Sequence, residues 1–85
     1  MKIVAAALKS QGLILSMPAP ARHSDIISAM HFGGTSPLEI AGCIQGFLTD
    51  KGTFVDRERA ALIAFEAEQF MPRRLPCELY SEDLW

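Results

Sequence analysis

The sequence has few of the features that mark metal-bound, disulfide-rich or membrane-spanning proteins. It contains two cysteines and two histidines in 85 residues. None of them forms the C-x-x-C or H-x-x-x-H spacing that is typical of a metal site. No apolar run approaches the roughly 20 residues that cross a bilayer. We therefore expect no metal, no cofactor and no membrane-spanning segment.

An excess of positive charge is also missing. Eight Lys and Arg residues stand against ten Asp and Glu residues, which gives a formal net charge of −2. Domains that bind nucleic acid usually have a pI above about 9, whereas the pI of this sequence is about 5.5. The hydrophobic fraction of 49% is too high for a disordered chain. These values predict a folded domain that binds neither nucleic acid nor membranes.

The small size of the chain predicts an oligomer. Residues 1–85 fit one small domain, and a domain of this size buries only about 60–70% of its unfolded surface. The apolar N-terminus continues into Lys9 and Gln11, unlike a signal peptide, so we expect Cys43 and Cys77 to be free thiols in a reducing compartment. With neither disulfides nor metals for reinforcement, we expect a homo-oligomer, a dimer or higher, with a hexamer among the sizes considered.

Hydrophobic patterning and turn residues predict an α/β (α+β) fold, with a small antiparallel sheet from two hairpins and with two helices. The expected strands cover residues 2–8 and 13–17 in the first hairpin, and fall within 40–48 and over 53–55 in the second. The expected helices cover residues 21–32, ended by Gly33-Gly34, and 57–70, begun by an Asp56 cap. Residues 35–38 are expected to form a loop, and the chain is expected to be irregular after Pro72.

Basic residues at the helix starts are the strongest chemical pattern. Arg22 and His23 lie at the start of the first expected helix, and Arg57 lies at the start of the second. Helix N-termini repel cations weakly but bind anions through their free amides, and the fork of an arginine suits phosphate. Arg73 and Arg74 would complete such a phosphate site from a loop. The sequence leaves open that each arginine only forms a surface ion pair.

Several other side chains can be interpreted either as structural or as ligand-binding residues. Phe47 is either a core residue or a ring on which a base stacks, and Asp56 either caps a helix or binds a ribose hydroxyl. Tyr80 and Trp85 are expected to contact a neighbouring subunit or to form the wall of a pocket. Cys43 with a histidine matches no nucleophile motif, so the sequence favours binding over catalysis.

Three segments together resemble a known phage family. They are residues 21–27 (ARHSDII), 45–61 (QGFLTDKGTFVDRERAA) and 79–85 (LYSEDLW). In this order they resemble the Thoeris anti-defence sponge family, in the first of its two types, over most of the chain from Ala21 to Trp85. The resemblance implies an α/β oligomer in the cytoplasm of the infected bacterial host. It also implies that the protein captures cyclic ADP-ribose isomers made by TIR-domain enzymes, and cyclic oligonucleotides of CBASS defence at separate sites, and cleaves neither.

The resemblance also implies which residues bind the ligand. The matching positions are Arg22, His23, Asp25, Phe47, Asp56 and Arg57. For Arg73 and Arg74 the resemblance implies ligand binding less strongly. The sequence departs from the family pattern at Ser24, where another histidine would be expected, and at Glu68, where a glycine would be expected. The alternatives are an inhibitor that covers a host defence complex directly and an enzyme that degrades the signal.

Overall fold

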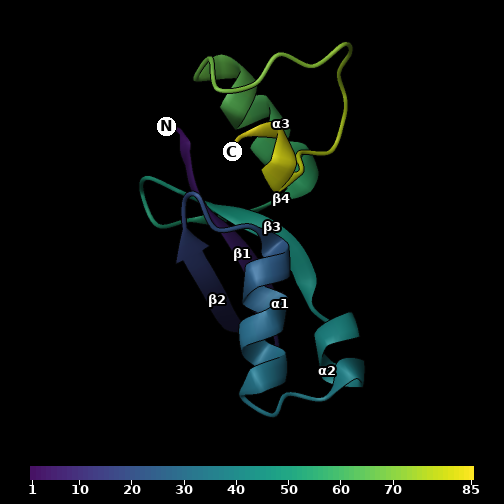
Figure 1. The fold of residues 1–85 in the computed structure, drawn as a ribbon. Coiled ribbons are helices and arrows are strands. Elements are labelled where there is room, and N and C mark those ends of the chain that lie inside the picture. Colours follow the sequence, from purple (N-terminus) through teal and green to yellow (C-terminus); the bar gives the residue numbers. More distant parts are fainter.

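The computed structural model describes residues 1–85 as a four-stranded sheet with three α-helices and one 3-10 helix (Figure 1). The α+β class and both hairpins predicted from the sequence are confirmed. Along the chain the elements are β1 (Ile3–Ser10), β2 (Leu13–Pro18), α1 (His23–Phe32), α2 (Pro37–Ala41), β3 (Ile44–Thr49), β4 (Phe54–Asp56), α3 (Arg57–Glu66) and η1 (Ser81–Asp83).

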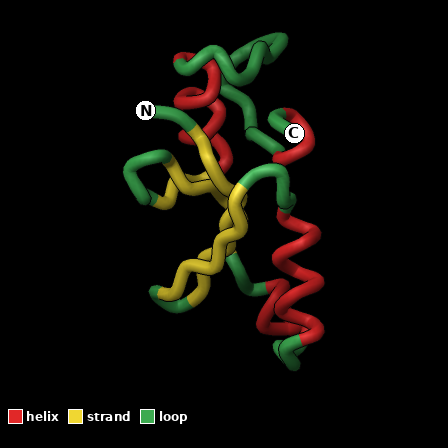
Figure 2. The backbone as a smooth tube through the Cα atoms, turned by 60° about the vertical axis from the view of Figure 1, so that its left-hand side comes forward, coloured by secondary structure: helices red, strands yellow, loops and turns green.

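The sheet is antiparallel throughout, in the order β2-β1-β3-β4. Figures 1 and 2 show α1 along one face of the sheet and no helix over the opposite face, while α3 packs at the end of the sheet near the N-terminus. The core follows this arrangement and has two parts. Ala6, Leu8 and Ile26 fill the space under α1. A larger cluster joins the sheet to α3 and to the end of the chain: Ile3, Phe47, Ala60, Ala61, Ile63, Ala64 and Leu79.

The first hairpin closes with a two-residue turn. Gln11 and Gly12 both have positive φ, at 49° and 83°, and Ser10 pairs with Leu13. Positive φ at both central residues is the geometry of the type I′ turn, whose twist matches that of the two strands it joins. The Gln11-Gly12 turn predicted from the sequence is therefore confirmed.

Gly46 is the tightest point of the second hairpin. A Cβ atom at this position would overlap the carbonyl oxygen of Val55 and the ring of Phe54. The absence of a side chain lets β4 and the Phe54 ring lie close against β3. This approach also fixes the position of the Gly46 carbonyl, which takes part in the site described below.

Residues 37–41 form a helix that the sequence analysis missed. Pro37 stands in its first turn, and the Ser36 hydroxyl accepts a hydrogen bond of 3.2 Å from the Glu39 amide. The predicted loop over residues 35–38 is thus wrong in its second half. Strand β3 begins at Ile44, inside the range of residues 40–48 predicted to hold it, and ends one residue beyond that range at Thr49. A helix of five residues is too short to show a periodic apolar pattern, and its stability comes from the serine cap and the proline.

Helix α3 begins as predicted but ends four residues early. The Asp56 carboxylate caps it by accepting a hydrogen bond of 2.8 Å from the Arg59 amide. At the other end, the Glu68 amide bonds to the Phe65 carbonyl and the Gln69 amide bonds to the Ala64 carbonyl. This pair of bonds is a Schellman motif, in which a residue just after the helix adopts a left-handed backbone conformation. That residue is Glu68, with φ of 60°, at the position where a glycine was expected.

We expect Glu68→Gly to stabilise the protein by about 1 kcal/mol, because a left-handed backbone is strained for every residue with a side chain. Urea unfolding of the variant would measure the change. The matched control is Glu66→Gly, which places glycine inside α3 and should destabilise the protein. Equal or lower stability of the Glu68 variant would contradict the strain assigned to this position.

Candidate functional site

The 79–85 segment, Leu79–Trp85, joins the starts of α1 and α3. The Leu79 amide donates a hydrogen bond of 3.0 Å to the Arg57 carbonyl, and the Leu79 side chain is fully buried. The indole nitrogen of Trp85 donates to the Ala21 carbonyl at 2.7 Å, and Arg22 Nε donates to the Trp85 carbonyl at 2.8 Å. Trp85 therefore packs within its own chain, a contact that the sequence did not predict.

His23 stands at the centre of this junction. Its Nε2 lies 2.7 Å from the Gly46 carbonyl oxygen and its Nδ1 lies 3.3 Å from Ser81 Oγ. Because a carbonyl oxygen only accepts, Nε2 carries the proton and donates it, which leaves Nδ1 of a neutral ring as an acceptor. The Ser81 hydroxyl beside Nδ1 also lies 3.4 Å from Glu82 Oε1. Both His23 and Ser81 are buried. This serine–histidine contact lies in the interior, where it connects α1, β3 and η1.

The pKa of His23 is lowered from its ordinary value. Burial is the main cause, because the charged imidazolium loses its hydration, and the nearby Arg57 guanidinium lowers the pKa further. The bond to the Gly46 carbonyl and the charge of Glu82 act in the opposite direction without overcoming the burial. The imidazole is therefore neutral at neutral pH and serves as a structural link.

Arg57 occupies the most distinctive position in the site. Its guanidinium lies over the ring of Tyr80, 4.5 Å from the ring centroid, and its Nη2 donates to Gln45 Oε1. The Nε atom is buried and has no hydrogen-bond partner. The side chain borders a surface hollow of about 410 Å³, hereafter the Arg57 hollow, lined by Cys43, Gln45, Asp56, Arg57, Glu58 and Glu78.

The Arg57 hollow is mixed in charge rather than basic. One guanidinium faces three carboxylates, those of Asp56, Glu58 and Glu78. The Asp56 carboxylate is already engaged as the cap of α3. The lining thus offers acceptors for hydroxyl and amino groups beside a single cationic donor group for an anion.

The structure brings together only part of the predicted site. Arg22 and Asp25 lie beside His23 at the start of α1, where the Asp25 carboxylate accepts from the Arg22 amide at 2.7 Å. Phe47 is fully buried and meets His23 edge-on at 4.9 Å between ring centroids. Its ring therefore offers no face on which a base could stack, and Phe47 is a core residue.

Arg73 and Arg74 lie apart from the other predicted residues. Both are exposed in the loop between α3 and η1. Figure 1 shows this loop beyond α3, on the side away from α1. In a single chain they do not join Arg22 and Arg57 in one anion site.

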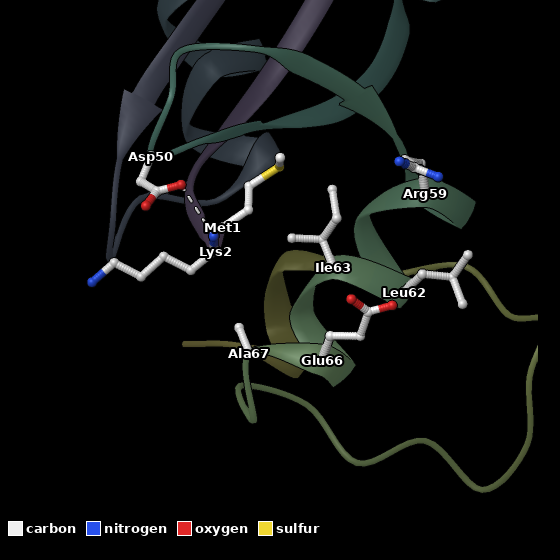
Figure 3. Close-up of a pocket in the computed structure, with 8 residues that line it drawn as sticks. All are labelled: Met1, Lys2, Asp50, Arg59, Leu62, Ile63, Glu66 and Ala67. Atoms are coloured by element: carbon white, nitrogen blue, oxygen red, sulfur yellow. Dashed lines mark hydrogen bonds between the residues drawn. The ribbon is translucent and has the colours of Figure 1, made fainter.

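A second hollow, of about 520 Å³, lies between the N-terminal residues and α3 (Figure 3). Asp50 and Lys2 form its sheet side, and the Lys2 amide donates to Asp50 Oδ1 at 3.1 Å. This hydrogen bond is the main cause of the lowered pKa of Asp50. The sequence analysis missed this hollow because its two sides are far apart in the chain. The α3 side is formed by Arg59, Leu62, Ile63, Glu66 and Ala67.

Metal and membrane features are absent from the described residues 1–85. No group of three or more His, Cys, Asp or Glu side chains is arranged to hold a metal ion. Cys43 and Cys77 are both free thiols. None of the helices has the length and apolar character needed to cross a membrane.

Comparison with known proteins places the chain in a phage family. Residues 2–85 match the family described as phage T4 y16D protein. The chain belongs to this family. No curated protein and no solved structure matches the chain. The description of the y16D family names a phage protein and states no activity.

Because the folded-state pKa of His23 lies below 6.5, the unfolded chain binds a proton that the folded chain does not. We therefore expect the free energy of unfolding to be highest above about pH 6.5 and to fall as the pH decreases from there toward the folded-state pKa. Urea unfolding at about pH 7.5 and about pH 5.5 would measure this decrease. His23→Gln should lose most of it, while His31→Gln, at an exposed histidine, should keep it. The same decrease in wild type and His23→Gln would contradict the account.

Proposed function

We propose that this phage protein captures cyclic nucleotide immune signals and holds them without cleaving them. Cyclic ADP-ribose isomers are the first ligand class, and cyclic oligonucleotides are the second. The observation that carries the proposal is the Arg57 guanidinium at the border of a hollow, with a buried Nε that has no acceptor.

An unpaired buried donor favours an anionic ligand. A donor in this state costs about 1–3 kcal/mol, more for a charged group, and an arriving acceptor removes that cost. Phosphate oxygens are the acceptors that best match a guanidinium. The start of α1 lies near Gly46, because His23 in its first turn bonds to the Gly46 carbonyl. Asp56, which caps α3, pairs with Gly46 in the sheet. Both helix starts thus lie near Gly46, and the start of α3, which favours negative charge, contributes Arg57 and Glu58 to the hollow.

The carboxylates of the Arg57 hollow fit the rest of a nucleotide. A cyclic ADP-ribose molecule carries ribose hydroxyls and an adenine amino group as well as phosphates. Carboxylate oxygens accept hydrogen bonds from hydroxyl and amino groups. Glu58 and Glu78 therefore suit the sugar or base, while Arg57 suits the phosphate.

The exposed apolar surface favours a second candidate, an inhibitor that covers a host defence complex. Three large side chains are more than 70% exposed near the end of the molecule that carries α2: Leu13 at 73%, Phe32 at 91% and Leu38 at 86%. Exposed apolar groups gathered in this way are typical of protein-binding surfaces. Binding of a small cyclic nucleotide to the isolated protein separates the two candidates, since only the first requires it.

Cyclic ADP-ribose isomers, added in excess, should raise the melting temperature of the protein, because a ligand that binds only the folded state stabilises it. Arg57→Ala should remove most of this increase. Arg59→Ala is the matched control, since Arg59 is an exposed arginine two residues along the chain that borders the other hollow. We expect the control to keep the full increase.

Two outcomes of the melting experiment would contradict the proposal. The first is no change with any cyclic ADP-ribose isomer or cyclic trinucleotide. The second is an equal increase in wild type and Arg57→Ala, which would remove Arg57 from the site.

We also propose that the chain forms a homo-oligomer through the helix-free face of the sheet. Ala6 and Leu8 point toward α1, so Lys9 and its cross-strand partners Ile14 and Ile44 point to the opposite face. Both isoleucines are more than 40% exposed there. A second copy would cover the two isoleucines, which flank Lys9 on a sheet face that no helix of the chain covers.

Light scattering should therefore give at least twice the chain mass of 9.3 kDa. Ile44→Asp should lower the mass toward that of one chain, because it places a charge in the proposed contact. Leu62→Asp, at a leucine that is 40% exposed on α3, is the control and should leave the mass unchanged. A wild-type mass of about 9.3 kDa would contradict the proposal.

A further inference from the structure

Tyr80 lies beside Arg57, and its aromatic ring is accessible to solvent. Its side chain is 43% exposed, and one face of the ring is covered by the Arg57 guanidinium at 4.5 Å. Phe47 is fully buried, and Phe32 lies at the far end of α1. Trp85 is half-buried against the larger core cluster.

The backbone holds the Tyr80 ring in place. Leu79 before it is fully buried and Ser81 after it is 1% exposed. The Tyr80 side chain therefore points outward from a backbone that is held by a buried residue on each side. Its amide donates to Asp83 Oδ2 at 2.9 Å, and its carbonyl accepts from the Asp83 amide at 2.9 Å. A ring fixed in this way loses little conformational entropy when a ligand binds.

The tyrosine hydroxyl has little structural use. Its only hydrogen bond, to Glu78 Oε2, is long at 3.4 Å and exposed. Glu78 also lines the Arg57 hollow, so the Tyr80 side chain contacts two residues of that hollow, Arg57 and Glu78. An exposed aromatic ring beside a mixed polar hollow offers a stacking surface for the base of a nucleotide.

We infer that Tyr80 is the residue on which the base of a bound nucleotide stacks. The inference rests on the proposed function and specifies its ligand as one that carries an aromatic base. The base lies on the open face of the ring, and the Arg57 guanidinium lies on the other face. The base, the tyrosine ring and the guanidinium then form one stack in this order, in which Arg57 packs against the ring and also binds the phosphate.

The chain contains a single tyrosine, which makes the test direct. The ring protons of Tyr80 give the only tyrosine signals in a proton NMR spectrum. Titration with cyclic ADP-ribose should shift these signals, because a stacked adenine places its ring current over them. In the same samples, the melting temperature reports whether the ligand binds at all.

Variants separate stacking from other roles of the side chain. Tyr80→Leu should weaken binding of cyclic ADP-ribose about 5- to 100-fold, the effect of losing one stacked base. Tyr80→Phe keeps the ring and should bind within about twofold of wild type. Phe32→Ala removes an exposed ring far from the hollow and should bind like wild type.

The outcomes distinguish the two proposals. If the ligand binds but the Tyr80 signals do not shift and Tyr80→Leu binds like wild type, the stacking inference is wrong and the proposed function stands. If no cyclic nucleotide raises the melting temperature, both are wrong. If Tyr80→Phe loses as much affinity as Tyr80→Leu, the hydroxyl rather than the ring binds the ligand, which overturns stacking.

Discussion

The buried imidazole of His23 is the contact on which the arrangement of the site depends. It donates to the Gly46 carbonyl and accepts from Ser81, and so connects three segments that lie far apart in the sequence. Only the contact of Nδ1 with Ser81 requires a neutral ring, which burial favours, because Nε2 donates to the Gly46 carbonyl in either protonation state. Loss of either partner would leave a polar group unpaired in a small core, which costs about 1–3 kcal/mol. A domain of 85 residues has little stability in reserve for such a loss.

This junction also determines where the functional groups lie. Gly46 lets β4 approach β3 closely, and β4 leads directly into the Asp56 cap and Arg57. Ser81 anchors the 79–85 segment, and this anchoring brings Tyr80 over the guanidinium. The same packing covers Phe47. The ring nearest the histidine is therefore part of the core, and the ring nearest the hollow is the accessible one.

Local sequence signals predicted the parts of the fold that depend on local chemistry. The Gln11-Gly12 turn and the Asp56 cap each follow from one or two residues and their immediate neighbours, and both were predicted correctly. The helix over 37–41 was missed because five residues show no periodicity. The contact between Arg57 and Tyr80 depends on how the 79–85 segment returns to the sheet, and so does the choice between the two interpretations of Phe47, of which core packing is confirmed. No local pattern contains that information. The basic residues at the starts of both helices were visible in the sequence, whereas the acidic lining of the Arg57 hollow required the fold.

This chain is a phage protein of the y16D family, and the function proposed for it is to bind a cyclic nucleotide and leave it intact. Equilibrium dialysis against cyclic ADP-ribose, followed by heating of the protein and chromatography of what is released, tests this claim most directly. The account predicts that the protein removes ligand from solution in proportion to its own concentration and that heating returns the same cyclic molecule. Recovery of a cleaved product, or no removal of any cyclic nucleotide from solution, would contradict it.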